Sequence, residues 1–388
     1  MSGAGELAMT VSAPPSPPRG RVRVCLVGPS LDILGGQAVQ LQRLLGKLRE
    51  VPELEVAFLP VNPRLPGPLR ALQRIKYVRT VATSLAYGWS LVRSLGRYDV
   101  VHCFSASYWS FMLAPLPAMA VARLYGKAVV LNYRSGQAAD HLTRWPSAVA
   151  RMRMAHAIVV PSGYLVDVFA RFGLSAQSIF NFVETDAIRY RRRAHVAPVF
   201  LSNRNFEEHY NVACVLRTFA RVQREVPEAR LVVAGDGPQR AMLHALAAQL
   251  GLRNVEWRGP VPPSEMADLY DAADVYLNAP SIDNMPNSII EAYAAGLPIV
   301  TTDAGGIPYI VSHERTALVV AKDDDQAMAS ATLRMLREPD LALRLADAGR
   351  NECLTKYVWP AVREEWTHLY TTLAMTTARD RAGATTVA

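Results

Sequence analysis

The stretch DNMPNSIIEAYAAGLPIV, Asp283 to Val300, predicts a loop, a helix and a strand in that order. It follows the apolar run Val275–Leu277, which is typical of a buried strand. Pro286 suits the first turn of a helix, and Gly296-Leu-Pro298 ends the helical pattern. Ile299–Thr301 then begins a second apolar run. A strand, a helix and a strand in this order predict a crossover unit of a parallel sheet.

The same alternation continues along most of the chain, with helical patterns between short β-branched runs. Continuous apolar strands of this kind are typical of parallel sheets covered on both faces. We therefore expect an α/β fold of two Rossmann-like, doubly wound domains. The runs form two series: Val22–Val27, Val56–Leu59, Val100–Cys103, Ala128–Leu131 and Ala157–Val160, then Val199–Leu201, Leu231–Ala234, Val255–Trp257, Val275–Leu277, Ile299–Thr301 and Ala317–Val320.

A polar break around Tyr190-Arg-Arg-Arg193 and Pro198 separates the two series. We expect one domain over residues 21–190 and a second over 198–358. A helix over 359–375 should pack back toward the first domain. Residues 1–20, rich in Pro, Ser and Gly, predict a disordered tail rather than a signal peptide, and 376–388 a flexible tail.

Composition excludes several classes of protein. Of 388 residues, 50% are apolar and 20% charged, which excludes disorder and a coiled coil. The four cysteines lie far apart without a CxxC, which argues against zinc and disulfide frameworks and fits a cytoplasmic protein. The run from Cys103 to Ala122 is uncharged, but its serines and prolines favour buried helix over a membrane span.

Charge is divided unevenly along the chain. Residues 1–198 hold 24 Lys and Arg against 10 Asp and Glu, whereas the remainder holds 18 against 24. A basic half suits phosphates, an anionic membrane or nucleic acid. Nucleic acid is not expected as a partner, because no recognisable binding motif is present.

Ligands of open parallel sheets bind at the carboxyl ends of the strands, so the loops after the strands are the candidate sites. Gly35-Gly36 opens a helical pattern and lets backbone amides approach an anion. Gly235-Asp-Gly-Pro238 follows the run Leu231–Ala234, and its Pro238 suits the first turn of a helix. Either pair of glycines can equally be a plain turn.

The loop before Glu291 is the richest candidate. Ser281 or Asn284 can cap the helix, and the free amides of Asn287 and Ser288 would bind an anion. Glu291 lies within a largely apolar helix, where an unpaired carboxylate is costly. A ligand hydroxyl would satisfy it.

The stretch from Asp283 to Val300 resembles the sugar-donor signature of family 4 retaining glycosyltransferases of the GT-B fold, in which two acidic residues lie eight positions apart. Further matches run in order from Val22 to Tyr370: Gly35-Gly36, Asn181-Phe-Val-Glu184, Ser202-Asn-Arg204 and Thr302-Asp-Ala-Gly-Gly-Ile-Pro308. The resemblance implies two domains facing across a cleft and a nucleoside-diphosphate sugar as donor substrate, with no metal or other cofactor. Asp323-Asp-Asp325 is interpreted as a solvated helix start.

The resemblance also implies roles for individual residues. Arg204 and the helix terminus at Asn287 and Ser288 would stabilise the leaving diphosphate. Glu291 would hold the ribose and Asp283 the sugar hydroxyls. The remaining donor-site candidates are Gly35, Gly36, Gly235, Asn284, Met285 and Pro286.

Two departures from the family pattern concern catalysis. His209 occupies the position of a usual Lys, and Arg134 follows a strand where a His is frequent, with His141 nearby. Arg134 and His209 therefore join Arg204 and Asp283 as catalytic candidates.

The resulting expectation is a retaining hexosyltransferase acting on a saccharide or lipid-linked acceptor in surface glycan, polysaccharide or glycolipid synthesis. A sugar-nucleotide epimerase and a non-catalytic binding relative remain alternatives. The segment from Arg64 to Arg97 is basic, amphipathic and free of acidic residues. It predicts peripheral association with an anionic membrane.

Overall fold

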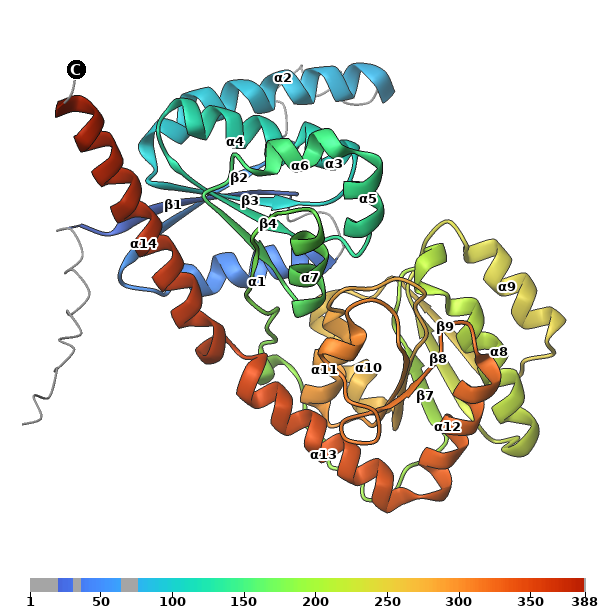
Figure 1. Ribbon diagram of the computed structural model, residues 1–388. Coiled ribbons are helices and arrows are strands. Elements are labelled where there is room, and N and C mark those ends of the chain that lie inside the picture. Colours follow the sequence, from blue (N-terminus) through green and yellow to red (C-terminus); the bar gives the residue numbers. More distant parts are fainter. Residues whose placement is uncertain (1–19, 31–35, 64–75, 387–388) are drawn as a thin grey trace, which may run out of the picture.

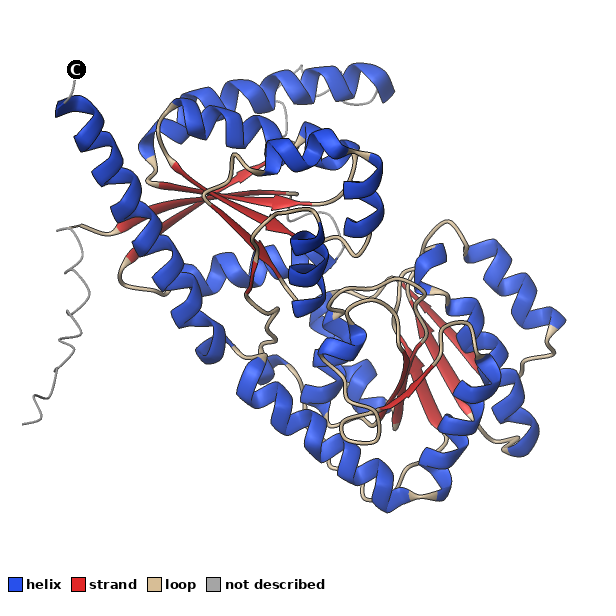
Figure 2. Ribbon diagram, viewed as in Figure 1, coloured by secondary structure: helices blue, strands red, loops and turns tan. Residues whose placement is uncertain are grey.

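The computed structural model describes residues 20–30, 36–63 and 76–386, which form two parallel six-stranded sheets (Figures 1 and 2). The expected α/β fold of two doubly wound domains is confirmed. The predicted tail over residues 1–20 and the glycine Gly35 lie outside the described residues, apart from Gly20.

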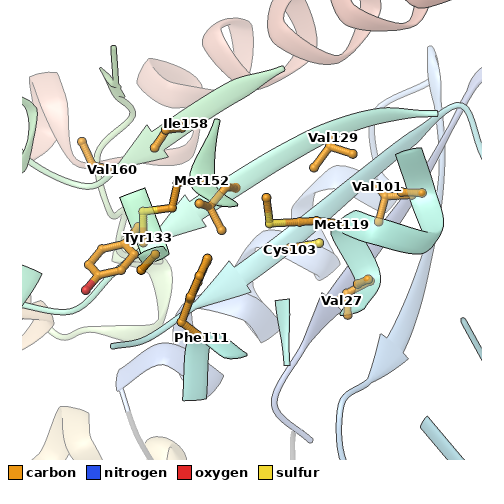
Figure 3. Close-up of a cluster of buried hydrophobic side chains, with 14 of the residues drawn as sticks. Val27, Val101, Cys103, Phe111, Met119, Val129, Tyr133, Met152, Ile158 and Val160 are labelled. Atoms are coloured by element: carbon orange, nitrogen blue, oxygen red, sulfur yellow. The ribbon is translucent and has the colours of Figure 1, made fainter. Parts of the chain in front are cut away.

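The N-terminal sheet has the order β2-β1-β3-β4-β5-β6. Its strands are β1 (Val22–Gly28), β2 (Leu54–Pro60), β3 (Val100–Ser105), β4 (Ala128–Tyr133), β5 (Ala157–Val160) and β6 (Gln177–Ser178). Its helices are α1 (Gly36–Arg49), α2 (Lys76–Ser94), α3 (Trp109–Leu113), α4 (Pro115–Leu124), α5 (Ala138–Arg144), α6 (Pro146–Met152) and α7 (Gly163–Arg171). Figure 3 shows the buried cluster on one sheet face, where Val27, Val101 and Val129 meet Met119 of α4.

The C-terminal sheet has the order β12-β11-β10-β7-β8-β9. Its strands are β7 (Val199–Ser202), β8 (Arg230–Ala234), β9 (Val255–Gly259), β10 (Val275–Asn278), β11 (Ile299–Thr302) and β12 (Leu318–Val320). Its helices are α8 (Val212–Glu225), α9 (Arg240–Gln249), α10 (Met266–Ala272), α11 (Asn287–Ala295), α12 (Asp325–Arg337) and α13 (Pro339–Lys356). Apolar residues fill both faces of the sheet.

The eleven predicted strands are all present, with ends shifted by at most two residues. Strand β6 was not predicted, because two residues are too short for a periodic pattern. The uncharged run from Cys103 to Ala122 forms the end of β3, then α3 and most of α4. Among the described helices, none combines the length and the apolarity that crossing a bilayer requires.

Helix α14 (Trp359–Thr386) returns from the C-terminal domain to the N-terminal sheet (Figure 1). Trp366 and Tyr370 pack into the core formed with β1 and β3, where Tyr370 Oη lies 2.7 Å from His102 Nδ1. Burial lowers the pKa of His102 to about 3. The expected flexible tail over 376–388 is wrong for residues 376–386, because α14 continues to Thr386.

Candidate active site

A cleft of about 490 Å³ lies between the carboxyl edges of the two sheets. Its walls come from the segments that follow the strands of both domains. The N-terminal domain supplies the start of α1 and the segment Arg134–Gln137 after β4. The C-terminal domain supplies Asn203–Asn205 after β7, Gly235 after β8, and Ile282–Ser288 after β10. The doubly wound topology therefore gathers the loops that the sequence singles out.

Helix α11 begins at Asn287, with Pro286 at its N-cap and no side-chain cap. The expectation that Ser281 or Asn284 caps this helix is wrong. The Asn284 side chain instead accepts a hydrogen bond from Ser162 Oγ of the N-terminal domain. Asn287 and Ser288 line the cleft at the positive end of the helix dipole, where anions are stabilised.

Arg204 lies at the base of the cleft and is held on three sides. Its Nη2 donates to Asp283 Oδ2 at 2.5 Å, and its Nη1 donates to Ser288 Oγ at 3.0 Å. The Tyr210 ring stacks on the guanidinium, with Cζ 3.9 Å from the ring centroid. Burial by itself would lower the pKa of Arg204, but the Asp283 carboxylate together with Tyr210, Tyr276 and Tyr270 raises it above the ordinary value, so this residue stays a cation.

Two glycine contacts shape this region. A Cβ at Gly235, where φ is +147°, would lie 2.3 Å from the carbonyl oxygen of Arg204. A Cβ at Gly305, where φ is +51°, would lie 2.2 Å from the carbonyl oxygen of Asp283. Only glycine fits these positions, so the glycines hold the Arg204 and Asp283 loops in place.

Glu291 lies one turn into α11. Its side chain is buried and lines the cleft. Its Oε2 accepts a hydrogen bond from Tyr270 Oη at 2.8 Å, and Asn203 Nδ2 donates to the same Tyr270 oxygen at 2.7 Å. Its Oε1 accepts from Arg43 Nη2 of helix α1, also at 2.8 Å. The carboxylate is thus held from both domains.

Arg134 follows β4 and faces the cleft from the N-terminal domain. It donates to the side-chain oxygens of Asn181 and Asn132, and its Cζ lies 5.6 Å from the Phe104 ring centroid. Both bonded side chains are uncharged amides. Burial lowers the pKa of Arg134 to about 10, which still leaves it a cation at neutral pH.

His209 lines the cleft, and burial lowers its pKa below the ordinary value of 6.5. It is therefore neutral near pH 7 and does not replace the charge of a lysine. His141 lies elsewhere, buried with its Nδ1 2.9 Å from Tyr133 Oη, and it is not among the residues that line the cleft.

Part of the chain matches a known protein family. Residues 187–352 match the model of the family described as glycosyl transferases group 1. The C-terminal domain is thus similar to a glycosyl transferases group 1 domain. This C-terminal domain supplies Arg204, Asp283, Ser288 and Glu291, whereas Arg134 comes from the N-terminal domain.

Two curated relatives are similar over most of their length. The chain is 25% identical over 249 residues to the lipopolysaccharide core biosynthesis glycosyltransferase LpsE of Rhizobium meliloti, which covers 61% of this chain and 71% of that protein. It is 27% identical over 280 residues to a GDP-mannose-dependent alpha-(1-6)-phosphatidylinositol monomannoside mannosyltransferase of Mycobacterium tuberculosis. That alignment covers 65% of this chain and 72% of that protein.

A solved structure shares the whole architecture. Anabaena HepE, crystallised in complex with UDP, superposes with a TM-score of 0.73 over 90% of this chain and 100% of that chain, at 14% identity. The two domains thus form a GT-B fold, as the resemblance implied.

Most candidates for the donor site lie together at the cleft. Gly36, Gly235, Asn284, Met285 and Pro286 line it beside the charged residues, whereas Gly35 is outside the described residues. The acidic run Asp323–Asp325 lies away from the cleft lining, and Asp324 caps α12 by accepting from the Ala327 amide. Across the described ranges, no cluster of three or more His, Cys, Asp or Glu side chains could hold a metal ion.

Sequence reasoning missed residues outside the C-terminal domain. Gln40 is buried and donates to Asn287 Oδ1 at 3.1 Å, and Arg43 reaches Glu291 one turn farther along both helices. These two residues follow Gly36 by four and seven positions, so they lie on one helix face. Polar residues at this helical spacing after a glycine pair are the sequence feature that could have indicated a cleft-facing helix surface.

Proposed function

We propose that the protein is a retaining glycosyltransferase that binds a nucleoside-diphosphate sugar in the cleft and transfers the hexose to an acceptor hydroxyl. The observation that carries this proposal is the grouping of Arg204, Arg134 and the α11 N-terminus around one cleft. Cations and free helix amides converging from two domains suit a ligand with several negative oxygens.

Arg134 supports an anionic ligand most directly. Arg204 is bonded to Asp283, but the bonds of Arg134 end on uncharged amides. A partly buried cation without a bonded carboxylate loses hydration that no negative charge replaces. A diphosphate would supply the missing negative charge, and Arg134 would take over the charge contribution that neutral His209 does not make.

The positions of the carboxylates fit the rest of a nucleotide sugar. Glu291 lies one turn beyond the helix terminus, about 5.4 Å along the axis, which suits a ribose next to a diphosphate. Asp283 lies at the opposite side of that terminus, beside Arg204, where it would accept hydrogen bonds from the hexose. Each carboxylate would then bind hydroxyl groups.

In the transfer step, the bond between the anomeric carbon and the diphosphate oxygen breaks, and its electron pair leaves with the diphosphate. The acceptor oxygen forms the new bond to the same carbon, and its proton passes to the departing phosphate oxygen. Arg204, Arg134 and the α11 amides would stabilise the charge that develops on the diphosphate. No step draws on a metal ion.

The acceptor is proposed to be a glycan or a lipid-linked saccharide, because the relatives act in lipopolysaccharide core synthesis and on a phosphatidylinositol mannoside.

The structure adds a surface that suits such an acceptor. On α2, Tyr87 and Leu91 are buried, whereas a second apolar stripe faces solvent. The stripe comprises Val81, Leu85, Trp89 and Val92, which are 62, 70, 68 and 52% exposed.

This α2 stripe is proposed to rest on an anionic membrane. Arg79 and Arg93 are exposed on the same helix, and no acidic residue occurs between residues 64 and 97. Apolar side chains flanked by cations are typical of helices that lie at membrane surfaces. The predicted cations Arg70 and Arg74 lie outside the described residues.

The test is turnover of a panel of nucleoside-diphosphate sugars with and without an extract of acceptor lipids and oligosaccharides. The proposal predicts nucleotide release together with a glycosylated product only when acceptor is present. Conversion of the sugar nucleotide to an isomer without acceptor would instead identify an epimerase. Nucleotide binding without any turnover would identify a non-catalytic relative.

A further inference from the structure

The carboxylate of Glu291 is bonded by two residues that come from different domains. Tyr270, on α10 of the C-terminal domain, donates to Oε2, and Arg43, on α1 of the N-terminal domain, donates to Oε1. The side chains of Arg43 and Glu291 are 15% and 11% exposed, so this ion pair is largely shielded from water. Both line the cleft.

Arg43 also retains an unused hydrogen-bond donor. Its Nη1 is buried and makes no hydrogen bond to the part of the chain that the structure describes. A buried guanidinium nitrogen without an acceptor is costly, and buried polar groups are nearly always paired. Because this nitrogen adjoins a cleft, an acceptor that arrives with a ligand would satisfy it.

The helices place Arg43 at a definite point relative to the α11 terminus. Asn287 Nδ2 donates to the carbonyl oxygen of Gly36 at 3.4 Å, and Gln40 Nε2 donates to Asn287 Oδ1 at 3.1 Å. Arg43 and Glu291 meet one turn farther on. Helices α1 and α11 therefore begin side by side, and the ion pair lies one turn from the proposed diphosphate position.

We infer that Arg43 completes the ribose site from the opposite domain. A ribose hydroxyl would donate to Glu291 and accept from Arg43 Nη1, while Arg43 Nη2 keeps the carboxylate in position. The ligand class is a nucleotide with a free 2′,3′-diol. This inference rests on the proposed function, and it makes nucleotide recognition depend on both domains rather than on the C-terminal domain alone.

The experiment is calorimetric titration of wild type and Arg43→Gln with UDP, GDP and ADP, and with the 2′-deoxy and 3′-deoxy forms of the nucleotide that binds most tightly. Arg49→Gln is the matched control, because Arg49 is an exposed cation on the same helix. Arg43→Lys tests whether charge alone suffices. Circular dichroism and thermal melting establish that each variant is folded.

Arg43→Gln should weaken binding about tenfold, the effect of one or more charge-assisted hydrogen bonds. It should also shrink the penalty for removing a ribose hydroxyl, while Arg49→Gln changes neither quantity. Unchanged affinity in folded Arg43→Gln would overturn the inference. An equal loss for ribose and deoxyribose ligands would also overturn it, because Arg43 would then act only on domain packing. Failure of wild type to bind any nucleotide would overturn the proposed function itself.

Discussion

Arg204 Nη2 and Asp283 Oδ2 lie 2.5 Å apart, and both side chains are about nine-tenths buried. This ion pair keeps the guanidinium in position before any ligand arrives. Its carboxylate also limits the positive charge at the base of the cleft. Charges arranged in advance cost no reorganisation during reaction, which is the condition for effective stabilisation of a leaving group.

Replacing Arg204 by Ala should lower turnover by about two to three orders of magnitude, the usual effect of removing a preorganised group that stabilises developing charge. Steady-state release of nucleotide from the sugar donor measures the change. Arg230→Ala is a suitable control, since Arg230 is an exposed arginine of the same domain paired only at the surface. Equal turnover for wild type and Arg204→Ala would shift the main cationic role to Arg134.

Replacing His209 by Lys should raise turnover or at least preserve it.

Arg134→Gln should lower turnover without lowering the stability of the free protein. The substitution removes a partly buried cation whose hydrogen bonds end on uncharged amides, so the thermal melting temperature of the free protein should stay constant or rise. Turnover should fall, because the leaving diphosphate loses a counter-charge. Differential scanning calorimetry and nucleotide release are measured on the same sample. A variant with wild-type turnover would remove Arg134 from the proposed mechanism.

Stability should fall in mild acid because two histidines are buried in neutral form. Burial lowers the pKa of His102 to about 3 and that of His141 to about 4, whereas both titrate near 6.5 in the unfolded chain. Below pH 6.5 the unfolded state therefore binds more protons. Each histidine should lower the free energy of unfolding by roughly 1.4 kcal/mol per pH unit, until about pH 4 for His141 and pH 3 for His102.

Urea unfolding at pH 7 and pH 5 measures this loss. His102→Gln should show a shallower pH dependence than wild type, and His368→Gln, at an exposed position, should match wild type. Identical pH dependence in wild type and His102→Gln would contradict the assignment. The comparison of slopes does not require the variant to be as stable as wild type.

The α2 stripe should mediate binding to liposomes that contain anionic phospholipid. Binding should weaken in high salt and in Arg79→Gln/Arg93→Gln, since each cation near such a surface contributes about 1 kcal/mol. Leu85→Ser/Trp89→Ser should weaken it further. Met242→Ser, at an exposed apolar position of α9, is the control. Protein that stays in the supernatant at low salt would contradict membrane docking. A dimer lost in Leu85→Ser/Trp89→Ser would show that a second copy covers the stripe.

The architecture was predictable from the sequence because its strands are buried on both faces. Runs such as Ala128–Leu131 and Leu231–Ala234 are apolar throughout, and only a covered parallel sheet tolerates that composition. The position of the α11 start was predictable for a similar reason, since Pro286 and Gly296 mark the helix ends locally. The short strand β6 and the full extent of α14 carry no comparable local signal.

Contacts between the domains were much less predictable. Asn284 is a residue type that often caps helices. Its side chain instead accepts a hydrogen bond from Ser162 of the other domain. Arg43 and Glu291 are 248 residues apart, and nothing near either position indicates the other. For α2 the sequence predicts an amphipathic helix, but it does not indicate which apolar residues face solvent: Leu85 and Leu91 are equally apolar, and only packing decides which one is buried.

The proposed function depends on the cleft being a site for a nucleoside diphosphate. Calorimetric titration of UDP, GDP and ADP into wild type and Glu291→Ala tests this most directly. We predict that wild type binds at least one of them at a single site. Folded Glu291→Ala should bind that nucleotide roughly 10- to 100-fold more weakly, because it loses charge-assisted hydrogen bonds worth about 1.5–3 kcal/mol. Wild type that binds none of the three, or Glu291→Ala with undiminished affinity, would contradict the proposed function.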